Sequence, residues 1–406
     1  MDKIIFHIDV NSAYLSWTAI KLLRQGAEVD IRKIPSIIGG SKESRHGIVL
    51  AKSIPAKQFN VKTGEPIVNA LQKCPNLEMV LPDHEYYAQQ SGQFISLLSE
   101  FTSDIEKVSI DECYIDFTNI RNNFSDGDRT MSPVEAAAFL KDEIYKNLGF
   151  TVNIGVSCNK LLAKMASDFK KPNLVHTLFP EEIEKKMWPM PVGKLYMVGK
   201  SSVRTLDNLG IKTIGDLAGT SVKILESHLK SHGRLIWEFA NGIDDTPIHP
   251  ETEQLKGVGN STTLSKDVEN STDAKKVLLD LAENVARRLR EYRQKSSMIS
   301  VEIKYNDFSK VSHQTTLNKS TDVGSEIYET SCQLFDKLWN GTPIRLLGIR
   351  TAKLQEYGEP EQITIFDMLE KDGLKYDKQR KADEAMDLIR KKYGNGAVTR
   401  ASLLKE

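Results

Sequence analysis

The sequence predicts a multidomain α+β fold, and three observations support this prediction. The chain has 406 residues, which is too long for one hydrophobic core and suggests roughly two to four domains. Residues 1–172 mix strand-like and helix-like segments, whereas residues 190–240 contain only short helical segments separated by glycines. Residues 256–355 then follow the order strand, helix, strand, strand, helix, strand, which is the order of a ferredoxin-like βαββαβ unit.

The first 172 residues predict a sheet covered by helices. IIFHIDV is predicted to form the first strand, and NSAYLSWTAIKLL an amphipathic helix that begins at the polar pair Asn11 and Ser12. Further predicted elements are helices over 85–105 and 133–149, a hairpin over 107–117, a strand over 151–157, and a helix that Pro172 stops.

The βαββαβ segment can be resolved into elements. Its predicted strands cover 256–264, 297–305, 311–318 and 343–354, and its predicted helices cover 272–294 and 323–338. The polar segment DDTPIHPETEQ, with its two prolines, predicts a linker before it. A further helix is predicted over 379–393, after the last strand.

The composition argues against several classes of protein. With 40% hydrophobic residues and a mean hydropathy of −0.37, the chain has no apolar run near the roughly 18 residues of a membrane span. MDKIIFHIDV is too short and too polar for a signal peptide, so we expect a cytoplasmic protein without a membrane role. Cys74, Cys113, Cys158 and Cys332 are scattered without a CxxC pair, which argues against a zinc site or a disulfide framework.

The charges are balanced overall but unevenly distributed. There are 55 basic and 55 acidic residues, yet residues 160–234 hold 13 Lys or Arg against 7 Asp or Glu, while residues 1–120 hold 12 against 15. An acidic N-terminal part before basic parts is compatible with metal binding followed by contact with a polyanion. Solvated helix faces would give the same distribution.

Two neighbouring acids interrupt an apolar segment in KVSIDECYIDF. Asp111 and Glu112 fall at the predicted turn of the 107–117 hairpin, and Asp9 lies at the end of the first predicted strand. If the strands are neighbours, three carboxylates converge, and such a cluster needs cations or shifted pKa values. Oxygen ligands without His or Cys favour Mg²⁺, and two such ions suit phosphoryl transfer. The alternative is a pair of surface acids bound to Lys or Arg.

Three motifs together resemble a known family. HIDVNSAY, SIDECYIDF and GVSCNKLLAKMASDFKKPN resemble, in order and spacing, the catalytic motifs of Y-family DNA polymerases, and particularly those of the DNA polymerase IV (DinB) branch. The resemblance runs from residue 1 to about residue 355. It implies template-directed, low-fidelity translesion DNA synthesis, by two-metal-ion nucleotidyl transfer from a dNTP to a primer 3′-hydroxyl. It also implies primer–template DNA as a partner, bound without sequence specificity, and a monomeric enzyme.

The resemblance implies a right-hand architecture with a ferredoxin-like palm, small fingers, a helical thumb with a helix-hairpin-helix, and a βαββαβ little finger. The expected boundaries are 1–11 and 76–172 for the palm, 12–75 for the fingers, 173–243 for the thumb, 244–254 for a linker, 255–356 for the little finger and 357–406 for a C-terminal tail.

By motif, the resemblance assigns the metal site. Asp9, Asp111 and Glu112 become the catalytic, metal-binding carboxylates, and the backbone carbonyl of Val10 completes one site. Two Mg²⁺ ions are expected as cofactors, and Mn²⁺ is expected to substitute for them. Their role is to align the primer 3′-hydroxyl with the α-phosphate of the nucleotide.

The resemblance also implies nucleotide contacts. Tyr14, five residues after Asp9, matches the aromatic residue that blocks a 2′-hydroxyl, although a Tyr packed in the core would give the same pattern. Lys160 at a helix start matches a residue that contacts the triphosphate. Lys57, with Ile54, stands where Arg and Tyr are usual, so it offers charge without the guanidinium fork. Lys164 is equally well explained as a solvated or structural lysine and stays outside the expected site.

The predicted thumb contains a DNA-contact element. PVGKLYMVGKSSVRTLDNLGIKTIGDLA resembles a helix-hairpin-helix, in which Gly199 and Lys200 would contact a DNA phosphate. Met197 departs from the pattern, because it stands where the first Gly of the turn is usual. A helix pair that ends at glycines is the alternative.

The tail carries a candidate partner motif. In EPEQITIFDMLEK, residues Gln362, Ile365 and Phe366 fit the short peptide that docks bacterial polymerases on the sliding clamp. An amphipathic helix would also explain apolar residues at this spacing.

Two other functions share part of the pattern. A polymerase-like scaffold without catalysis is disfavoured, because all three acids and Tyr14 are present. A palm-fold nucleotidyl cyclase would share the acids but would have no use for a helix-hairpin-helix, a basic βαββαβ domain or a clamp peptide.

Overall fold

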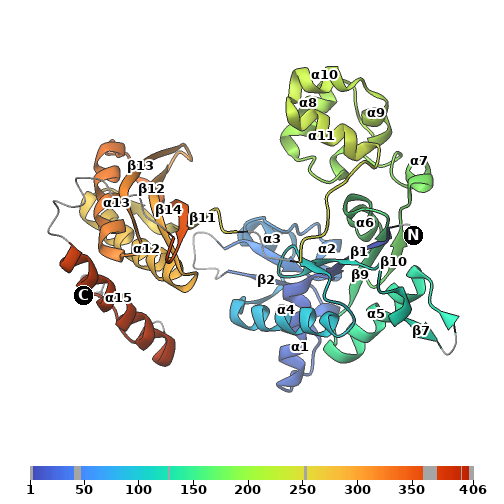
Figure 1. Ribbon diagram of the computed structural model, residues 1–406, viewed down its shortest axis with the longest axis horizontal. Helices are drawn as coiled ribbons and strands as arrows, with labels where there is room; N and C mark the ends of the chain where they lie inside the picture. The colour runs from blue at the N-terminus through green and yellow to red at the C-terminus, as the bar shows by residue number, and fades with distance from the viewer. Residues whose placement is uncertain are drawn as a thin grey trace. The chain divides into compact units, whose positions relative to one another are not determined.

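The structure is a computed structural model and describes residues 3–40, 47–126, 129–250, 254–359, 373–394 and 396–401. The chain forms two compact units. The first spans Met1–Lys42 and Gly47–Thr252, and the second spans Glu253–Glu406 together with Glu43–His46. Figure 1 shows the elements of each unit. No helix among the described residues is both long and apolar enough to cross a membrane.

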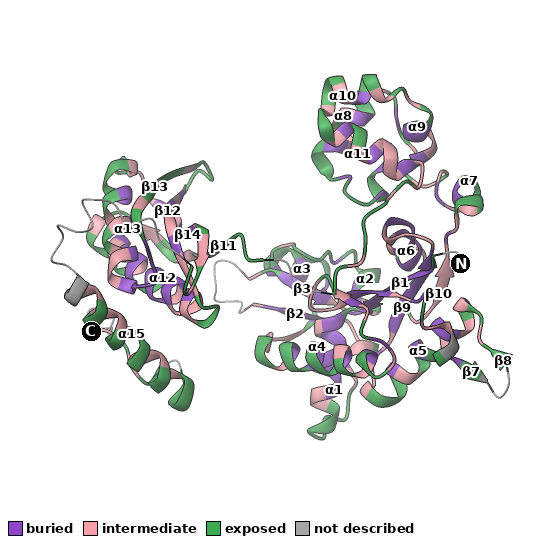
Figure 2. Ribbon diagram, viewed as in Figure 1, coloured by how far each residue is buried: buried purple, intermediate pink, exposed green. Residues whose placement is uncertain are grey.

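A five-stranded sheet forms the centre of the first unit. Its strands lie in the order β10 (Val175–Thr177), β9 (Val152–Ser157), β1 (Ile5–Val10), β6 (Glu112–Asp116) and β5 (Ile105–Lys107). The central strand β1 pairs antiparallel with both β6 and β9, and every residue of β1 and β9 is buried (Figure 2). This confirms that the first part of the chain forms a sheet, as predicted.

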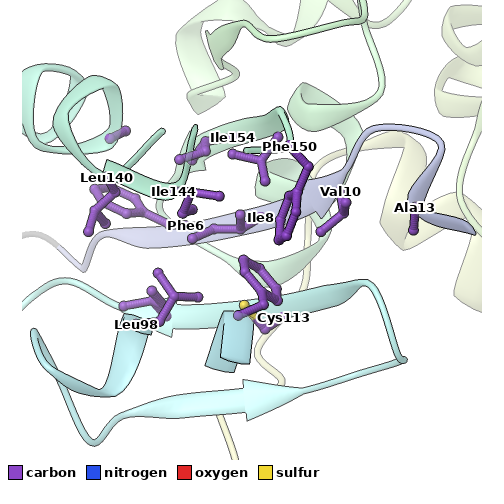
Figure 3. Packing of buried hydrophobic residues seen from close by; sticks show 14 of the residues in the cluster. Phe6, Ile8, Val10, Ala13, Leu98, Cys113, Leu140, Ile144, Phe150 and Ile154 are labelled. Carbon is purple, nitrogen blue, oxygen red and sulfur yellow. The ribbon is translucent and has the colours of Figure 1, made fainter. Parts of the chain in front are cut away.

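Alternation along β1 divides its side chains between two faces of the sheet. Phe6, Ile8 and Val10 point into the main apolar core with Leu98 and Leu140 (Figure 3). These two leucines come from helices α4 (His84–Ser99) and α5 (Pro133–Leu148). Ile5, His7 and Asp9 therefore face the opposite side, where Ile5 packs with Ala163 of helix α6 (Lys160–Ser167). Asp9 is thus held at the end of a rigid, buried strand.

The remaining elements of the first unit are short. They are α1 (Ala13–Arg24), η1 (Ile31–Lys33), β2 (Ser36–Gly39), β3 (Val49–Lys52), α2 (Ile54–Gln58), α3 (Ile67–Lys73), β4 (Glu78–Val80), η2 (Arg121–Asn123), β7 (Ser125–Asp126), β8 (Arg129–Thr130), η3 (Pro180–Glu182), α7 (Ile183–Lys186) and η4 (Val192–Lys194). Strands β3, β2 and β4 form a small sheet in that order. It escaped prediction because none of its strands exceeds 4 residues.

One predicted helix was too long. The helix expected over 85–105 ends at Ser99, and Ile105 begins strand β5 instead. The backbone N–H of Asp104 donates to the Thr102 hydroxyl at 3.0 Å, which forms a local turn, and Ile105 pairs with Ile115. The pairing with β6 outweighs the helical pattern.

The predicted short helices after residue 190 are confirmed. They are α8 (Lys200–Asn208), α9 (Ile214–Gly219), α10 (Val222–Leu229) and α11 (Ser231–Ala240). Their apolar residues form one cluster with Leu161, Leu162 and Met165 of α6. Helix α6 therefore packs against the sheet on one side and contributes to this helical core on the other.

The second unit confirms the predicted βαββαβ order. The elements are β11 (Gly257–Val268), α12 (Ser271–Glu291), β12 (Gln294–Tyr305), β13 (Lys310–Thr321), α13 (Gly324–Leu338) and β14 (Ile344–Glu356). The strands lie in the order β11-β14-β12-β13, and both helices cover one face over a continuous apolar core. A last helix, α15 (Gly373–Tyr393), begins earlier than the predicted 379–393.

Candidate active site

A cavity of about 600 Å³ opens where strand β1 ends in the first unit. Its walls come from the β1–α1 turn, the β3–α2 segment, the turn before β6, and the loop after α6. The residues on these walls that matter for chemistry are Asp9, Val10, Tyr14, Lys52, Lys57, Asp111 and Lys171. Five of these seven are predicted site residues, and they come from distant segments of the chain.

The acids are placed by strand pairing. Asp9 and Glu112 are cross-strand partners in the β1–β6 ladder, so their side chains leave the sheet on the same face. Asp111 lies in the turn just before β6, where its backbone carbonyl accepts from the Val10 N–H at 3.0 Å. The Ser109 hydroxyl donates to Asp111 Oδ1 at 2.7 Å. Asp111 lines the cavity and Glu112 does not.

Two lysines lie among these acids. Lys171 Nζ is 2.7 Å from Asp9 Oδ1, and Lys164 Nζ is 2.7 Å from Glu112 Oε1 and 3.7 Å from Asp9 Oδ2. Asp168 reaches both lysines, at 2.9 Å from Lys171 and 3.5 Å from Lys164. Asp9 and Glu112 are therefore neutralised by ammonium groups of the chain itself.

Burial shifts the protonation of the cluster. Burial raises the pKa of Asp9 to about 6, with a further increase from Glu112, against the opposing charges of Lys171 and Lys164. Burial also holds the pKa of His7 well below 6.5, and the positive charge of Lys164 adds to this effect. Folding thus buries the Asp9 carboxylate where water solvates it poorly. A pKa raised in this way is typical of a functional acid.

The donor atoms fit a hard divalent cation. Asp9, Asp111 and Glu112 offer carboxylate oxygens, and Val10 lines the same cavity, without a Cys or His ligand. Among the described residues, no three His, Cys, Asp or Glu side chains are gathered closely enough to chelate a metal. Lysine ammonium groups occupy the space between the acids, so metal binding requires the side chains to rearrange.

Tyr14 forms one wall of the cavity at the start of α1. Its ring stacks on Tyr87, with centroids 4.5 Å apart and planes 11° apart. The Tyr87 hydroxyl lies 2.7 Å from the Thr18 hydroxyl, which also donates to the Tyr14 carbonyl at 2.7 Å. Ser12, before the helix, has a left-handed φ of 47°. The ring is thus rigidly held.

Of the basic residues near the site, Lys57 and Lys171 line the cavity, whereas the predicted Lys160 does not. Lys57 on α2 lines the cavity together with Ile54. Lys160 does not line it, because its ammonium lies 2.7 Å from Glu106 and 5.0 Å from the ring centre of Tyr114. Lys171 lines the cavity instead.

Lys171 was missed because Pro172 after it was taken only as a helix stop. The signal was the pair of lysines in KKPN, at the end of the motif GVSCNKLLAKMASDFKKPN. Its loop is fixed by buried amides: the Asn173 N–H donates to Asn11 Oδ1 at 2.8 Å, and Asn153 Nδ2 donates to the Lys170 carbonyl at 2.7 Å.

The other predicted site residues lie outside this cavity. Gly199 and Lys200 begin α8, and Met197 before them is half-exposed with a left-handed φ of 68°. A residue with a side chain thus adopts the conformation that a Gly usually takes in this turn. Gln362, Ile365 and Phe366 lie outside the described residues.

The chain is similar to known proteins over its whole length. Residues 8–168 match the impB/mucB/samB family, and residues 255–365 match the C-terminal domain of that family. The chain is 45% identical to DNA polymerase IV of Clostridium acetobutylicum, over 100% of this chain and 99% of the relative. It is 34% identical to DNA polymerase IV 1 of Bacillus subtilis, over 100% and 94%. A solved Y-family DNA polymerase chimera shares the fold with a TM-score of 0.72 at 22% identity, covering 87% of this chain and 99% of the chimera.

Proposed function

We propose specific roles for the residues of this cavity in a chain that belongs to the Y-family DNA polymerases and, within them, to the DNA polymerase IV (DinB-like) branch. The chain is a DNA-directed DNA polymerase of the translesion type, so primer–template DNA and dNTPs are its substrates. The observation that supports the proposal is the meeting of Asp9, Asp111, Tyr14 and Lys171 on one cavity.

Asp9, Asp111 and Glu112 are the proposed ligands of two Mg²⁺ ions, with the Val10 carbonyl at one of them. When bound, such ions activate the primer 3′-hydroxyl and stabilise the charge on the transferring phosphate, and Mn²⁺ can supply the same chemistry. The task of the chain is to hold these oxygens on a rigid sheet, so that the reacting groups meet without reorganisation.

Lys171 and Lys57 are the proposed partners of the incoming triphosphate. Both line the cavity, Lys57 from helix α2 and Lys171 from the loop after α6, and the Lys171 ammonium already pairs with a carboxylate there. The geometry favours Lys171 over the predicted Lys160, whose ammonium is bound by Glu106. A Lys at position 57 gives a point charge, so the orientation of the phosphates depends more on Lys171.

Tyr14 is the proposed barrier against ribonucleotides. Its ring cannot retreat, because Tyr87 stacks on one side of it and Trp17 lies 6.2 Å from it. A 2′-hydroxyl beside such a fixed ring has no space.

DNA contacts are proposed for both units. The open face of the second unit carries a groove of about 670 Å³ on the side of the sheet away from α12 and α13. Small or uncharged side chains such as Ser261, Ser300 and Gln314 line much of it. Its charged residues are Arg350 and Glu302, and Glu302 is paired with Lys310 at 2.9 Å. Such a lining suits the sugar–phosphate backbone rather than specific bases. Gly199 and Lys200 are the proposed phosphate contact of the helical part.

The clamp partner, the oligomeric state and the cellular location are proposed as well. We assign Gln362, Ile365 and Phe366 to the bacterial sliding clamp, on the basis of their spacing and place after the last strand. The enzyme is proposed to act as a monomer, in the cytoplasm at the nucleoid, where its DNA substrate lies.

Primer extension tests the metal site. Asp111→Ala and Glu112→Ala are expected to lower Mg²⁺-dependent extension by at least about 10³-fold while DNA affinity changes little, because these residues hold metals and not phosphates. Glu106→Ala is the matched control, since this acid binds Lys160 outside the cavity. Normal extension by both acid variants would reject the site, and a wild type without extension would favour the scaffold.

A further inference from the structure

Helix α6 lies unusually close to the sheet, because Gly155 leaves room for it. A Cβ at position 155 would lie 1.9 Å from the Ala163 carbonyl oxygen and 2.5 Å from the Ser167 backbone nitrogen. Asn159 fixes the start of the helix, where its side chain accepts from the Leu162 N–H at 2.8 Å. This approach brings Lys164 onto the face of β1 and β6 that carries Asp9 and Glu112.

Lys164 is built into the acid cluster on its buried side. Its ammonium contacts Glu112 Oε1 at 2.7 Å, Asp168 Oδ2 at 3.5 Å and Asp9 Oδ2 at 3.7 Å. Among the described residues, Lys164 is the only Lys or Arg within salt-bridge distance of Glu112. Although burial lowers it, the pKa of Lys164 ends above its ordinary value, because the hydrogen bond to Glu112 and the neighbouring acids raise it.

His7 of strand β1 lies near the other oxygen of Glu112. His7 Nε2 lies 3.9 Å from Glu112 Oε2, while His7 Nδ1 is 2.8 Å from the Ser167 hydroxyl. That hydroxyl in turn donates to the Lys164 carbonyl at 2.8 Å. Lys164 and His7 therefore lie on the two sides of the Glu112 carboxylate, and the Ser167 hydroxyl links them.

Lys164 and Lys171 differ in what they can reach. The Lys171 side chain is 35% exposed and lines the cavity, so it can turn to a substrate. The Lys164 side chain is 12% exposed and does not line the cavity. Its ammonium is thus available to the acids and not to a nucleotide.

We propose that Lys164 is a positioning residue: a fixed internal cation that orients Glu112 and Asp9 for nucleotidyl transfer and neutralises them whenever no metal ion does. This inference rests on the proposed metal-binding role of the two acids. A carboxylate has two oxygens, so Lys164 can hold Oε1 of Glu112 while Oε2 stays available to a cation. Partners that orient metal ligands in this way typically change metal affinity or activity by about 10- to 100-fold when they are removed.

Thermal unfolding in EDTA and in Mg²⁺ tests the proposal without relying on activity. Lys164→Met keeps the length of the side chain and removes its charge, which leaves Glu112 without an ammonium partner. We expect the Tm in EDTA to fall by about 5–10 °C, because an uncompensated buried charge is strongly destabilising. Saturating Mg²⁺ or Mn²⁺ should recover at least half of the loss, whereas Lys164→Arg should lose much less in EDTA.

Lys160→Met is the matched control, since Lys160 lies on the same helix with the same 12% exposure and its own carboxylate partner. Its loss in Tm should be equal with and without the metal ion. An equal loss for Lys164→Met in both conditions would overturn the proposal and leave Lys164 as a packing residue.

Kinetics provide the second readout. Lys164→Met should lower kcat by about 10- to 100-fold with little change in the KM for dNTP, because the lysine orients ligands and does not touch the substrate. A rise in KM with unchanged kcat would contradict this role. If Glu112→Ala abolishes extension while Lys164→Met behaves like Lys160→Met, the proposed function stands and only this inference fails. Normal extension by Glu112→Ala would instead reject the proposed function.

Discussion

Lys171 Nζ and Asp9 Oδ1 lie 2.7 Å apart, although 162 residues separate them in the chain. The pair joins the end of β1 to the loop after α6. It compensates a carboxylate that folding has buried, and it holds the ammonium that we propose as a triphosphate contact beside Asp9. Water therefore solvates the Asp9 carboxylate poorly, and a bound cation would stabilise its negative charge.

The burial of Asp9 predicts a cost in stability that depends on pH. A carboxyl whose pKa rises to about 6 on folding costs about 3 kcal/mol once it is ionised. The cost is absent below the unfolded pKa, grows as the pH rises, and is complete above the folded pKa. Asp9→Asn should therefore be inactive yet more stable than the metal-free wild type at pH 7.5, and the difference should shrink as the pH falls from 6 to about 4.

Chemical denaturation of both proteins in EDTA, across this pH range, measures that difference. Asp116→Asn is the control, because Asp116 also ends a strand of the same sheet but only caps the following turn. A constant difference between wild type and Asp9→Asn at all pH values would show that burial of the charge is not its cause.

Tyr14→Ala should admit ribonucleotides. Removal of the ring that Tyr87 holds in place should reduce the discrimination between dNTP and rNTP by about 100-fold, or ~2.7 kcal/mol, with most dNTP incorporation kept. Single-nucleotide insertion kinetics with both sugars give the ratio. Tyr14→Phe should discriminate as the wild type does, since it keeps the ring. Unchanged discrimination by Tyr14→Ala would make Tyr14 a packing residue.

Lys171→Ala and Lys160→Ala separate the two candidate triphosphate contacts. Lys171 lines the cavity and Lys160 is bound to Glu106, so only Lys171→Ala should raise the KM for dNTP, by about 10-fold or more for a lost charge-assisted contact. Steady-state kinetics on one primer–template measure this. If Lys160→Ala alone raised the KM, the motif-based assignment would be right and the geometric one wrong.

Local sequence patterns predicted part of the fold and part of the site. Alternation and helix punctuation predicted the strand that ends at Asp9, the α6 helix and the whole βαββαβ segment, because those signals lie within a few residues. The pairing of Asp9 with Glu112 joins residues 103 positions apart; the predicted strands made it possible, and only the resemblance of motifs indicated that the two strands are neighbours. The contacts of Lys164 and Lys171 with these acids were not predicted, since they depend on how closely α6 approaches the sheet.

Two further features of the fold also depend on tertiary contacts that local sequence patterns do not show. Ile105, the first residue of strand β5, was predicted as the end of a helix because its pairing with β6 is tertiary. The order β11-β14-β12-β13 places the last strand of the second unit between the first two, and no local pattern encodes this choice.

The C-terminal helix α15 is bound to the second unit mainly by charges. The Asp322 side chain is fully buried, and it accepts from Tyr376 Oη at 3.1 Å and Arg380 Nε at 3.2 Å, both on α15. Arg390 Nη2 lies 3.0 Å from buried Glu283 on α12. Ending the chain at residue 372 should therefore destabilise the second unit by about 3–5 kcal/mol, because both acids lose cations.

Thermal unfolding of the truncated protein measures this loss. Adding Asp322→Asn and Glu283→Gln to the truncated protein should restore part of the stability, since neutral amides tolerate burial without a cation better than carboxylates do. A truncated protein as stable as the full chain would mean that α15 adds no net stability.

The clamp motif is tested by changing Gln362, Ile365 and Phe366 together to Ala. Extension of a short primer without the clamp should stay the same, while stimulation by a loaded clamp should be lost. The motif lies between the end of β14 and α15, so both flanks lead to the second unit. Tethering by such a segment raises the concentration of the polymerase at the primer end to about millimolar without a new DNA contact.

Clamp binding and processivity of the wild type and the triple variant give the answer. Ile363→Ala is the matched control, because it changes an apolar neighbour that the clamp motif does not use. An amphipathic helix would use Ile363 as well as Phe366, so equal losses for Ile363→Ala and the triple variant would favour packing over docking. Stimulation that survives the triple change would identify the motif as a chance match and move the search for the clamp contact to α15.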